Sequence, residues 1–164
     1  MRMLRSTGEI EHDNWERVDG DDVTVDALPA GNLIVSLQVW RANAALAQTH
    51  RGRIGVWLHN SDEPESLEAD VLALPLLAVD FPAFNDGRGL SSAVLLRTRM
   101  GYTGDLRAIG AVQLDQLSYM CRCGFTSFAL TAEADAEAMR KHLVVMTEYY
   151  QSSATEPTPL FRRR

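Results

Sequence analysis

The sequence is poor in the residues and runs on which several classes of protein depend. It has only two cysteines among 164 residues, Cys121 and Cys123, so we expect no structural disulfide in a reducing compartment. No stretch approaches the roughly 18 apolar residues of a membrane span, and the N-terminal residues lack the apolar core of a secretory signal. We therefore expect a cytoplasmic protein without membrane association.

An excess of basic residues is also lacking. The chain has 16 Lys and Arg against 22 Asp and Glu, a net charge of −6 at pH 7. This balance argues against nucleic-acid binding, which usually depends on a basic patch, and we interpret Arg162–Arg164 as a solvated tail. Metal motifs are lacking too, because the histidines share no ligand spacing and the thiols of Cys-x-Cys point apart on a helix. We expect no metal site.

What the sequence does have is the pattern of an α/β protein. Its hydrophobic share of 46% is that of an ordinary globular domain. Helical patterns alternate with short apolar runs, which favours a parallel sheet with right-handed crossovers. We predict a single three-layer α/β domain with a mainly parallel sheet of about five strands, either doubly wound or resembling a partial barrel. The predicted strands are 33–37, 54–58, 76–80, 106–110 and 126–130.

Helical periodicity places helices between and after these strands. They lie around residues 40–47, from Pro64 to Leu74, from Leu90 to Gly101, from Leu114 to Gly124, and from about Glu133 to Gln151. The third and fourth end at a glycine followed by an aromatic residue and threonine, a pattern typical of a left-handed C-terminal cap.

The chain divides into three parts. Residues 1–27 form an N-terminal extension with a candidate hairpin around Gly20 and Asp21. Residues 28–151 form the α/β domain, and residues 152–164, with two prolines, form a disordered tail.

The loop 81–89 is the first candidate site. It makes its β-α unit longer than the neighbouring ones, and it follows a strand, where ligands of open α/β proteins gather. In one interpretation, Asp86-Gly87-Arg88-Gly89 and the nearby Ser91 bind a small anion at a helix start. In the other, Asp86 caps the helix and Arg88 pairs with a carboxylate.

Arg107 and Asp115-Gln116 are further candidates. Arg107 lies inside a predicted strand, where burial is costly unless the guanidinium is paired. Either it begins the strand at the solvent edge, or it pairs with a carboxylate such as Asp105 or Asp115, and we favour the structural pair. Asp115 and Gln116 open a helix, where an acidic first turn also suits the helix dipole without any ligand.

These residues lead to one spatial prediction. We expect Asp86, Arg88, Arg107 and Asp115 to cluster at the carboxyl edge of the sheet, with Gln116 lining the same cleft.

The two thiols are weaker candidates. Cys121 falls on an apolar helical stripe and is interpreted as a packing residue. Cys123 is a candidate reactive thiol beside Arg122, but a position at a helix C-terminus does not lower the pKa of a cysteine.

Several irregular motifs in register resemble one known family. They are Phe81-Pro82-x-Phe84-x-Asp86-Gly87-Arg88-Gly89-x-Ser91, then Arg97, Gly101-Tyr102-x-Gly104-x-Leu106-Arg107-Ala108-x-Gly110, Asp115-Gln116-Leu117 and Arg122-Cys123-Gly124-Phe125. Together they resemble the bacterial domain of unknown function 934 family. The weaker part of the resemblance extends from Leu28 to Leu130.

The resemblance implies a pathway. The family is described as an oxidoreductase involved in sulfite reduction, because its genes lie beside assimilatory sulfite reductase. The chain departs from the family pattern at Leu90, where a tyrosine is frequent, and at Ala111 and Leu114, where an acid and an arginine are frequent. If those three positions carry chemistry, this member is altered or inactive.

Two functional hypotheses follow. In the first, the protein is an accessory protein of sulfur assimilation that supports sulfite reductase or its electron donor. In the second, it is a small enzyme or anion-binding protein of the same pathway that uses Asp86, Arg88, Arg107 and Asp115. No flavin, haem or iron–sulfur motif is evident, so the cofactor remains open and would belong to an unrecognised site or to a partner.

Overall fold

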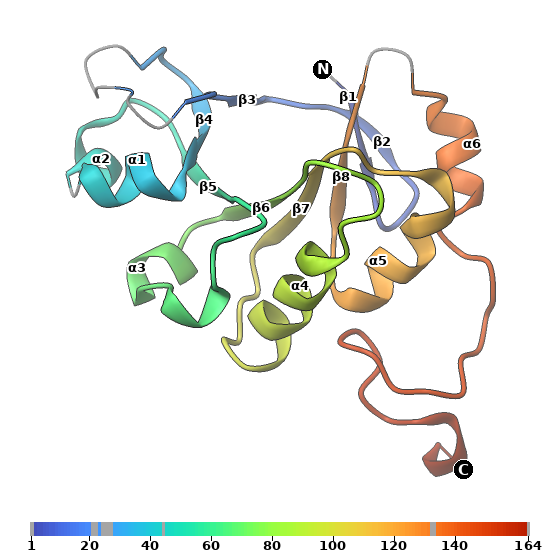
Figure 1. Ribbon diagram of the computed structural model, residues 1–164. Helices are drawn as coiled ribbons and strands as arrows, with labels where there is room; N and C mark the ends of the chain where they lie inside the picture. The colour runs from blue at the N-terminus through green and yellow to red at the C-terminus, as the bar shows by residue number, and fades with distance from the viewer. Residues whose placement is uncertain (1, 21–22, 24–27, 44, 132–133, 164) are drawn as a thin grey trace.

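The structure is a computed structural model that describes residues 2–20, 23, 28–43, 45–131 and 134–163. In these residues eight strands form one sheet, in the order β2-β1-β8-β7-β6-β5-β4-β3 (Figure 1). The strands are β1 (Arg2–Arg5), β2 (Ile10–His12), β3 (Trp15–Arg17), β4 (Asn32–Ser36), β5 (Ile54–Leu58), β6 (Leu76–Phe81), β7 (Asp105–Gly110) and β8 (Ser127–Leu130).

The sheet is mainly parallel, as predicted. Strands β3 to β8 lie in chain order and are parallel to one another, whereas β1 is antiparallel to both β8 and β2. β4 to β8 correspond to the five predicted strands. The expected total of about five is wrong, because β1, β2 and β3 add to the sheet. Strands of three or four residues are too short for their alternation to stand out in a sequence.

The helices are equally short, except for one. They are α1 (Leu37–Ala42), α2 (Leu46–Thr49), α3 (Ala69–Leu72), α4 (Arg88–Thr98), α5 (Leu117–Cys123) and α6 (Ala136–Lys141), with 3₁₀ turns η2 (Pro64–Ser66), η3 (Leu114–Gln116) and η4 (Leu160–Arg162). α5 ends as predicted, because Gly124 adopts the left-handed conformation with φ of 107°. That conformation disfavours any residue with a Cβ atom.

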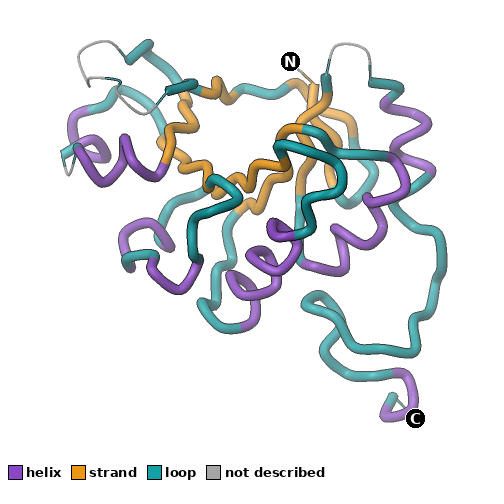
Figure 2. Tube along the Cα trace, viewed as in Figure 1, coloured by secondary structure: helices purple, strands orange, loops and turns teal. Residues whose placement is uncertain are grey.

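The helices lie on one side of the sheet, so the expected three-layer arrangement is wrong. Each connection from β4 to β8 joins adjacent parallel strands, and right-handed crossovers in one direction place every connecting helix on the same face. Figure 2 shows the strands in a curved arc with the helices outside it. Of the two predicted topologies, the partial barrel describes this arrangement. A doubly wound sheet would require the strand order to reverse.

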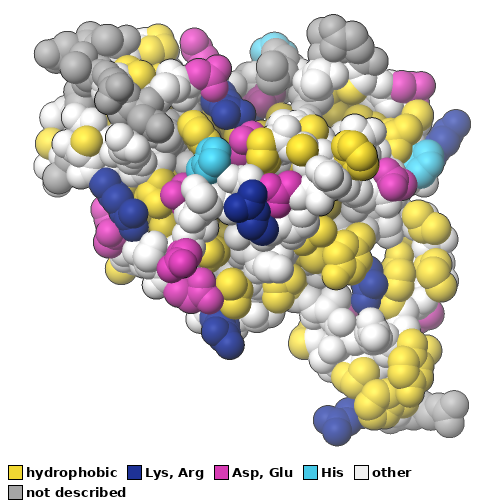
Figure 3. Space-filling view, viewed as in Figure 1, with side chains coloured by type: hydrophobic (Ala, Val, Ile, Leu, Met, Phe, Trp, Pro, Cys, Tyr) yellow, Lys and Arg dark blue, Asp and Glu magenta, His cyan; other side chains and the backbone are white. Residues whose placement is uncertain are grey.

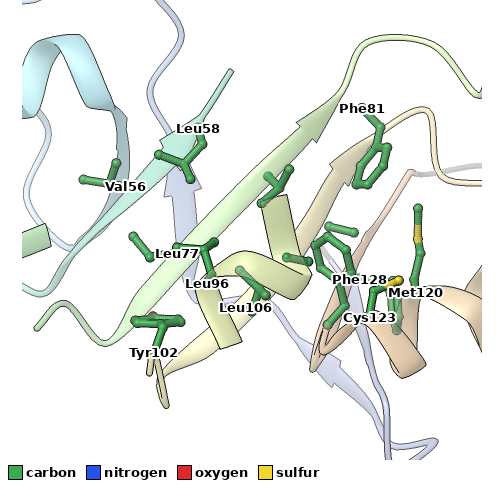
Figure 4. Close-up of a cluster of buried hydrophobic side chains, with 14 of the residues drawn as sticks. Val56, Leu58, Leu77, Phe81, Leu96, Tyr102, Leu106, Met120, Cys123 and Phe128 are labelled. Carbon is green, nitrogen blue, oxygen red and sulfur yellow. The ribbon is translucent and has the colours of Figure 1, made fainter. Parts of the chain in front are cut away.

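The two faces of the sheet are packed differently. On the outer face, strand residues such as Leu77, Leu106 and Phe128 pack with Leu96 of α4 and Met120 of α5 (Figure 4). On the inner face, a small separate cluster contains strand residues and no helical residue: Ile34, Trp57, Leu76, Ala78 and Ile109, with Trp15 and Ala129 partly buried against them. The main hydrophobic core therefore lies between the sheet and the helices.

The curvature brings the two edge strands near each other. β2 ends at His12 and β3, at the opposite edge of the sheet, begins at Trp15. The three residue steps from His12 to Trp15 can span at most roughly 11 Å, so these two strand ends lie close together. In Figure 1, β3 runs across from β4 towards β1 and β2. The connection, Asp13 and Asn14, therefore crosses beside the inner face, and Asp13 is buried there.

The C-terminal segment differs from the predicted helix. α6 ends at Lys141 instead of near Gln151, and Val144, Val145 and Met146 are exposed. The apolar residues whose spacing predicted a longer helix are therefore not buried as one face of a helix. The following chain projects from the body of the molecule (Figure 1). The segment predicted as a disordered tail is described up to residue 163, and the Ala154 amide donates a hydrogen bond to the Arg122 carbonyl over 3.1 Å.

The candidate hairpin around Gly20 and Asp21 falls partly outside the described residues. Within its described part, β3 pairs with β4. The hairpin that the structure contains lies earlier, between β1 and β2. No helix in the described ranges has both the length and the apolar character that crossing a membrane requires.

Candidate functional site

The loop between β6 and α4 is held by one carboxylate. The Asp86 side chain accepts hydrogen bonds from the Arg88 backbone amide (3.2 Å) and from Arg88 Nε (3.0 Å) and Nη2 (2.7 Å). Asn60 Nδ2 donates a fourth over 2.6 Å. The hydrogen bonds from Arg88 and Asn60 hold the pKa of Asp86 well below its usual range. The pair of Arg88 with a carboxylate is the one that the structural alternative from the sequence contains. The expected cap differs, because the N-cap residue of α4 is Gly87 and Asp86 accepts from the amide of the first helical residue, Arg88.

The same loop packs closely on the sheet through Gly89. This glycine is buried at the start of α4, and a Cβ atom there would lie 2.8 Å from the Phe81 ring and 2.9 Å from Val79. Gly87 has no such neighbour, and Ser91 is exposed. Position 89 therefore requires glycine because α4 packs too closely on β6 to leave room for a side chain.

The turn η3, which follows β7, contacts the loop 81–89 at the same edge of the sheet. Gln116 Nε2 donates a hydrogen bond to the Phe84 carbonyl over 2.6 Å, which ties the turn η3 to the loop 81–89. Asp115 is exposed in η3. The structure therefore brings Asp86, Arg88 and Gln116 to one edge, as predicted.

Arg107 lies elsewhere, on the inner face of β7. Its guanidinium donates from Nη1 to both carboxylate oxygens of Asp13 at 2.9 Å, and the side chains are 1% and 4% exposed. Nε donates to Ser127 (3.2 Å), and Nη2 lies 3.4 Å from Asp105. The predicted cluster of four residues therefore divides between two places, and Arg107 fits the favoured structural pair.

Asp13 is the residue that sequence reasoning missed. It lies 94 positions from Arg107, in the connection between two very short strands. The signal that pointed to it was indirect, because a guanidinium inside a buried strand requires a carboxylate partner. Of the two carboxylates named from the sequence, Asp105 lies 3.4 Å from Arg107, farther than Asp13, and Asp115 is exposed in η3 and is not a partner of Arg107.

Asp105 is held in its charged form. Burial raises the pKa of this carboxyl, but hydrogen bonds from Thr126 and Ser127 and the positive charges of Arg107 and Arg5 outweigh it, so the pKa lies below its usual value. The distances are 2.7 Å from Thr126 Oγ1 and 2.8 Å from Ser127 Oγ.

Neither thiol is activated. Burial raises the pKa of Cys121 to about 11 and also raises the pKa of Cys123. Cys123 is 4% exposed and belongs to the outer core (Figure 4). A reactive cysteine needs access and a lowered pKa, so these surroundings favour packing over catalysis at both positions. In the described part of the chain, no three His, Cys, Asp or Glu side chains are grouped to hold a metal ion.

Arg97 and Tyr102, which belong to the quoted motifs, also stabilise the fold. Arg97 donates to the carbonyls of Gly124 (2.9 Å), Tyr102 (2.7 Å) and Gly104 (2.9 Å). These contacts fix the ends of α5 and of the connection between α4 and β7. The Tyr102 hydroxyl in turn donates to the carbonyls of Leu74 and Asp105.

The loop edge also carries exposed apolar side chains. Phe84 is 63% exposed, Tyr119 54% and Leu114 38%. Tyr119 lines a groove of about 390 Å³ between α4 and α5 together with Leu90, Val94 and Leu95. We call Phe84, Leu114, Tyr119 and this groove the apolar edge surface.

A further cavity lies on the inner face. It has a volume of about 540 Å³ and is lined by residues of β3, β4, β7 and β8 and of the chain next to them: Asp13, Trp15, Glu16, Arg17, Asp19, Ile34, Arg107, Ile109, Gly110, Ala129, Leu130 and Thr131. We call it the inner pocket.

Fold and site define a class: a one-sided α/β domain whose consecutive parallel strands curl into part of a barrel. The chain belongs to the family described as bacterial protein of unknown function (DUF934), which matches residues 55–161. No curated protein matches the chain, and no solved structure does. The matched range contains the whole apolar edge surface, whereas the β3 and β4 wall of the inner pocket precedes it.

Proposed function

We propose that this protein supports assimilatory sulfite reduction as an accessory protein, by docking onto sulfite reductase or its electron donor. The pathway rests on the family resemblance and on the gene neighbourhood that it implies. The docking role rests on the apolar edge surface. We place the contact there because this edge combines exposure, rigidity and apolar character.

The position of Phe84 is the observation that carries the proposal. A phenyl ring that is 63% exposed stands on a loop whose neighbours are fixed by hydrogen bonds from Gln116, Asn60 and Arg88. Large exposed apolar groups that cluster on a surface mark sites of interaction. Ordering this loop beforehand lowers the entropy that binding costs. Aromatic anchors of this kind dominate many interfaces.

The polar groups of the loop favour the accessory role over catalysis. Arg88 directs Nε and Nη2 to Asp86, so one two-donor edge of its guanidinium is occupied, and the lowered pKa of Asp86 makes that carboxylate a weak base. Arg107 is likewise neutralised by Asp13. An anion such as sulfite would have to displace Asp13 from Arg107, and at Arg88 it would meet the negative charge of Asp86.

Deleting the gene tests the pathway. We expect impaired growth when sulfate is the only sulfur source, with rescue by sulfide or cysteine. Normal growth on sulfate in a strain without a duplicate gene contradicts the assignment. A purified protein that reduces sulfite without a partner contradicts the accessory role.

A pair of matched variants tests the docking surface. Phe84→Ser should abolish co-purification with sulfite reductase or its electron donor, because it removes the exposed ring from the apolar edge surface. Phe161→Ser is the control, since Phe161 is 57% exposed but lies in η4 near the C-terminus. Equal loss with both variants, or no loss with Phe84→Ser, would contradict docking through this edge.

A further inference from the structure

We propose that the inner pocket binds a neutral small molecule with a flat aromatic body. The site is separate from the apolar edge surface, and the proposal is independent of the docking role. It rests on the place of the pocket in the sheet, on its apolar walls and on the ion pairs that the charged side chains around it already form.

The position and the size of the pocket are those of a ligand site. It extends from Arg107, in the middle of β7, to Gly110 and Thr131, which lie at or just beyond the carboxyl ends of β7 and β8. Ligands of open parallel sheets bind beyond these ends. The volume of about 540 Å³ falls in the range of roughly 300–1,000 Å³ of small-molecule sites.

The strand register decides which of the lining side chains point into the pocket. Arg17 of β3 lies beside Ile34 of β4, which belongs to the inner cluster. Because side chains alternate along a strand, Trp15 points to the inner face together with Arg17. Glu16 lies beside Leu33 of the outer core, so its carboxylate points away from the pocket.

The walls of the pocket are apolar. Trp15, Ile34, Ile109 and Ala129 line it and belong to the inner cluster or pack against it. The guanidinium of Arg53 lies 5.4 Å from the centre of the Trp15 ring, so this indole already has a cation on it. A flat aromatic ligand suits these walls, because it buries apolar area against them and stacks with aromatic rings at little cost.

The charged groups beside the pocket are paired with one another. At its base, Arg107 directs Nη1 to both carboxylate oxygens of Asp13 at 2.9 Å, and the two side chains are 1% and 4% exposed. At its rim, Arg17 lies 2.9 Å from Asp19 and 3.2 Å from Asp80. Acidic and basic side chains are also interspersed on the face of the molecule shown in Figure 3. An ionic ligand would therefore lose hydration without meeting an unpaired opposite charge on these residues.

Thr131 supplies a neutral polar group at the opening. It lines the pocket, is exposed, and lies two positions after Ala129, on the same side of the chain. A hydroxyl both donates and accepts hydrogen bonds. A flat ligand that ends in a hydroxyl or carbonyl group therefore suits both the walls and the opening.

Three naphthalene derivatives test the charge preference. 2-Naphthalenemethanol is neutral, 2-naphthylmethylamine is a cation in neutral solution, and 2-naphthoate is an anion. By isothermal titration calorimetry at constant ionic strength, we expect saturable binding of the alcohol, at least about tenfold tighter than that of either ion.

A filled pocket tests the location of binding. Ala129→Phe places a ring among the apolar walls and should abolish binding of the alcohol. Ala154→Phe is the control, because Ala154 is another half-buried alanine but lies in the C-terminal segment. It should leave the affinity unchanged.

A charge placed at the opening tests the location without altering the walls. Thr131→Glu, at an exposed position, should raise the affinity of the amine relative to the alcohol about twofold to fivefold. Thr7→Glu is the matched control. Thr7 is also exposed, but it lies beyond the opposite end of β8, because the antiparallel β1 pairs Arg5 with Ser127. It should leave the ratio unchanged.

Three outcomes would overturn the proposal: an ion that binds as tightly as the alcohol, alcohol binding that survives in a folded Ala129→Phe variant, or no saturable binding of any of the three probes to the full chain. Should Ala129→Phe fail to fold, Thr131→Glu decides the question. An unchanged ratio of amine to alcohol affinity would then place the binding elsewhere and overturn the proposal.

Discussion

Two guanidinium–carboxylate pairs in this protein have the same chemistry and different physical roles. Arg88 and Asp86 are two positions apart, and the Arg88 side chain is 63% exposed. Arg107 and Asp13 are 94 positions apart and almost fully buried. The first pair shapes one turn at the loop edge. The second ties the connection between β2 and β3 to β7 on the inner face of the sheet.

The largest expected effect is the loss of the buried pair. Arg107→Met should reduce the free energy of unfolding by about 3–5 kcal/mol, because it leaves Asp13 as an uncompensated buried carboxylate. Urea denaturation followed by circular dichroism measures the loss. In the double variant Arg107→Met, Asp13→Leu the loss should be smaller than the sum of the two single losses. A loss below about 1 kcal/mol would contradict the assigned role.

The next largest expected effect is a difference in stability loss between substitutions on the two faces of β7. Leu106 is completely buried in the outer core, whereas Ile109 borders the inner pocket. Leu106→Ala should cost about 2–5 kcal/mol of unfolding free energy. Ile109→Ala should cost about half as much, because its neighbours already leave space. Equal losses in urea denaturation would show that the inner face is packed as densely as the outer one.

A smaller difference in stability is expected between alanine substitutions at two glycines of the loop. Gly89→Ala should cost about 1–3 kcal/mol through overpacking, since the new methyl group would lie 2.8 Å from Phe81 and 2.9 Å from Val79. Gly87→Ala should change stability by no more than about 0.5 kcal/mol, because the atom nearest to the new methyl group, Cδ1 of Leu90, would lie 4.0 Å away. Thermal unfolding of both variants measures the difference, and similar melting temperatures would contradict it.

Local patterns predicted much of this fold. The apolar runs of β4 to β8 and the left-handed cap at Gly124 depend on neighbours in the sequence, so periodicity and turn chemistry identify them. The turn at Asp86 and Arg88 is local in the same way. The Arg88–carboxylate pair of one of its two interpretations is present in the structure.

Long-range contacts explain what the sequence did not predict. β1 and β3 have four and three residues and are stabilised by pairing with β8 and β4, which periodicity within so short a segment cannot indicate. The position of Asp13 depends on the curvature of the sheet. The inner pocket has the same origin, because Trp15, Ile34 and Ile109 meet only after the sheet has curled.

The smallest expected effect is a change in acid stability at the exposed pair. An Asp titrates near 3.9 in an unfolded chain, and hydrogen bonds from Arg88 and Asn60 lower the pKa of Asp86 in the folded protein. A carboxyl with a lowered folded pKa stabilises the protein above pH about 4, and that stabilisation is lost as the pH falls through the folded pKa. Arg88→Gln should raise the folded pKa towards the unfolded value, so the variant should unfold at a slightly higher pH.

At neutral pH the same variant should be nearly as stable as the parent, because solvent screens an exposed pair. Acid titrations followed by circular dichroism, with the Asp86 carboxyl signal followed by NMR, separate the two effects. Arg99→Gln is the control, since Arg99 is 71% exposed and lies 3.9 Å from Glu65, in a pair remote from the loop. If Arg88→Gln leaves the Asp86 titration unchanged, then Asn60 and the helix amide alone hold this carboxylate. Arg88 would then be free to bind an anion, and the accessory role would lose its support from this loop.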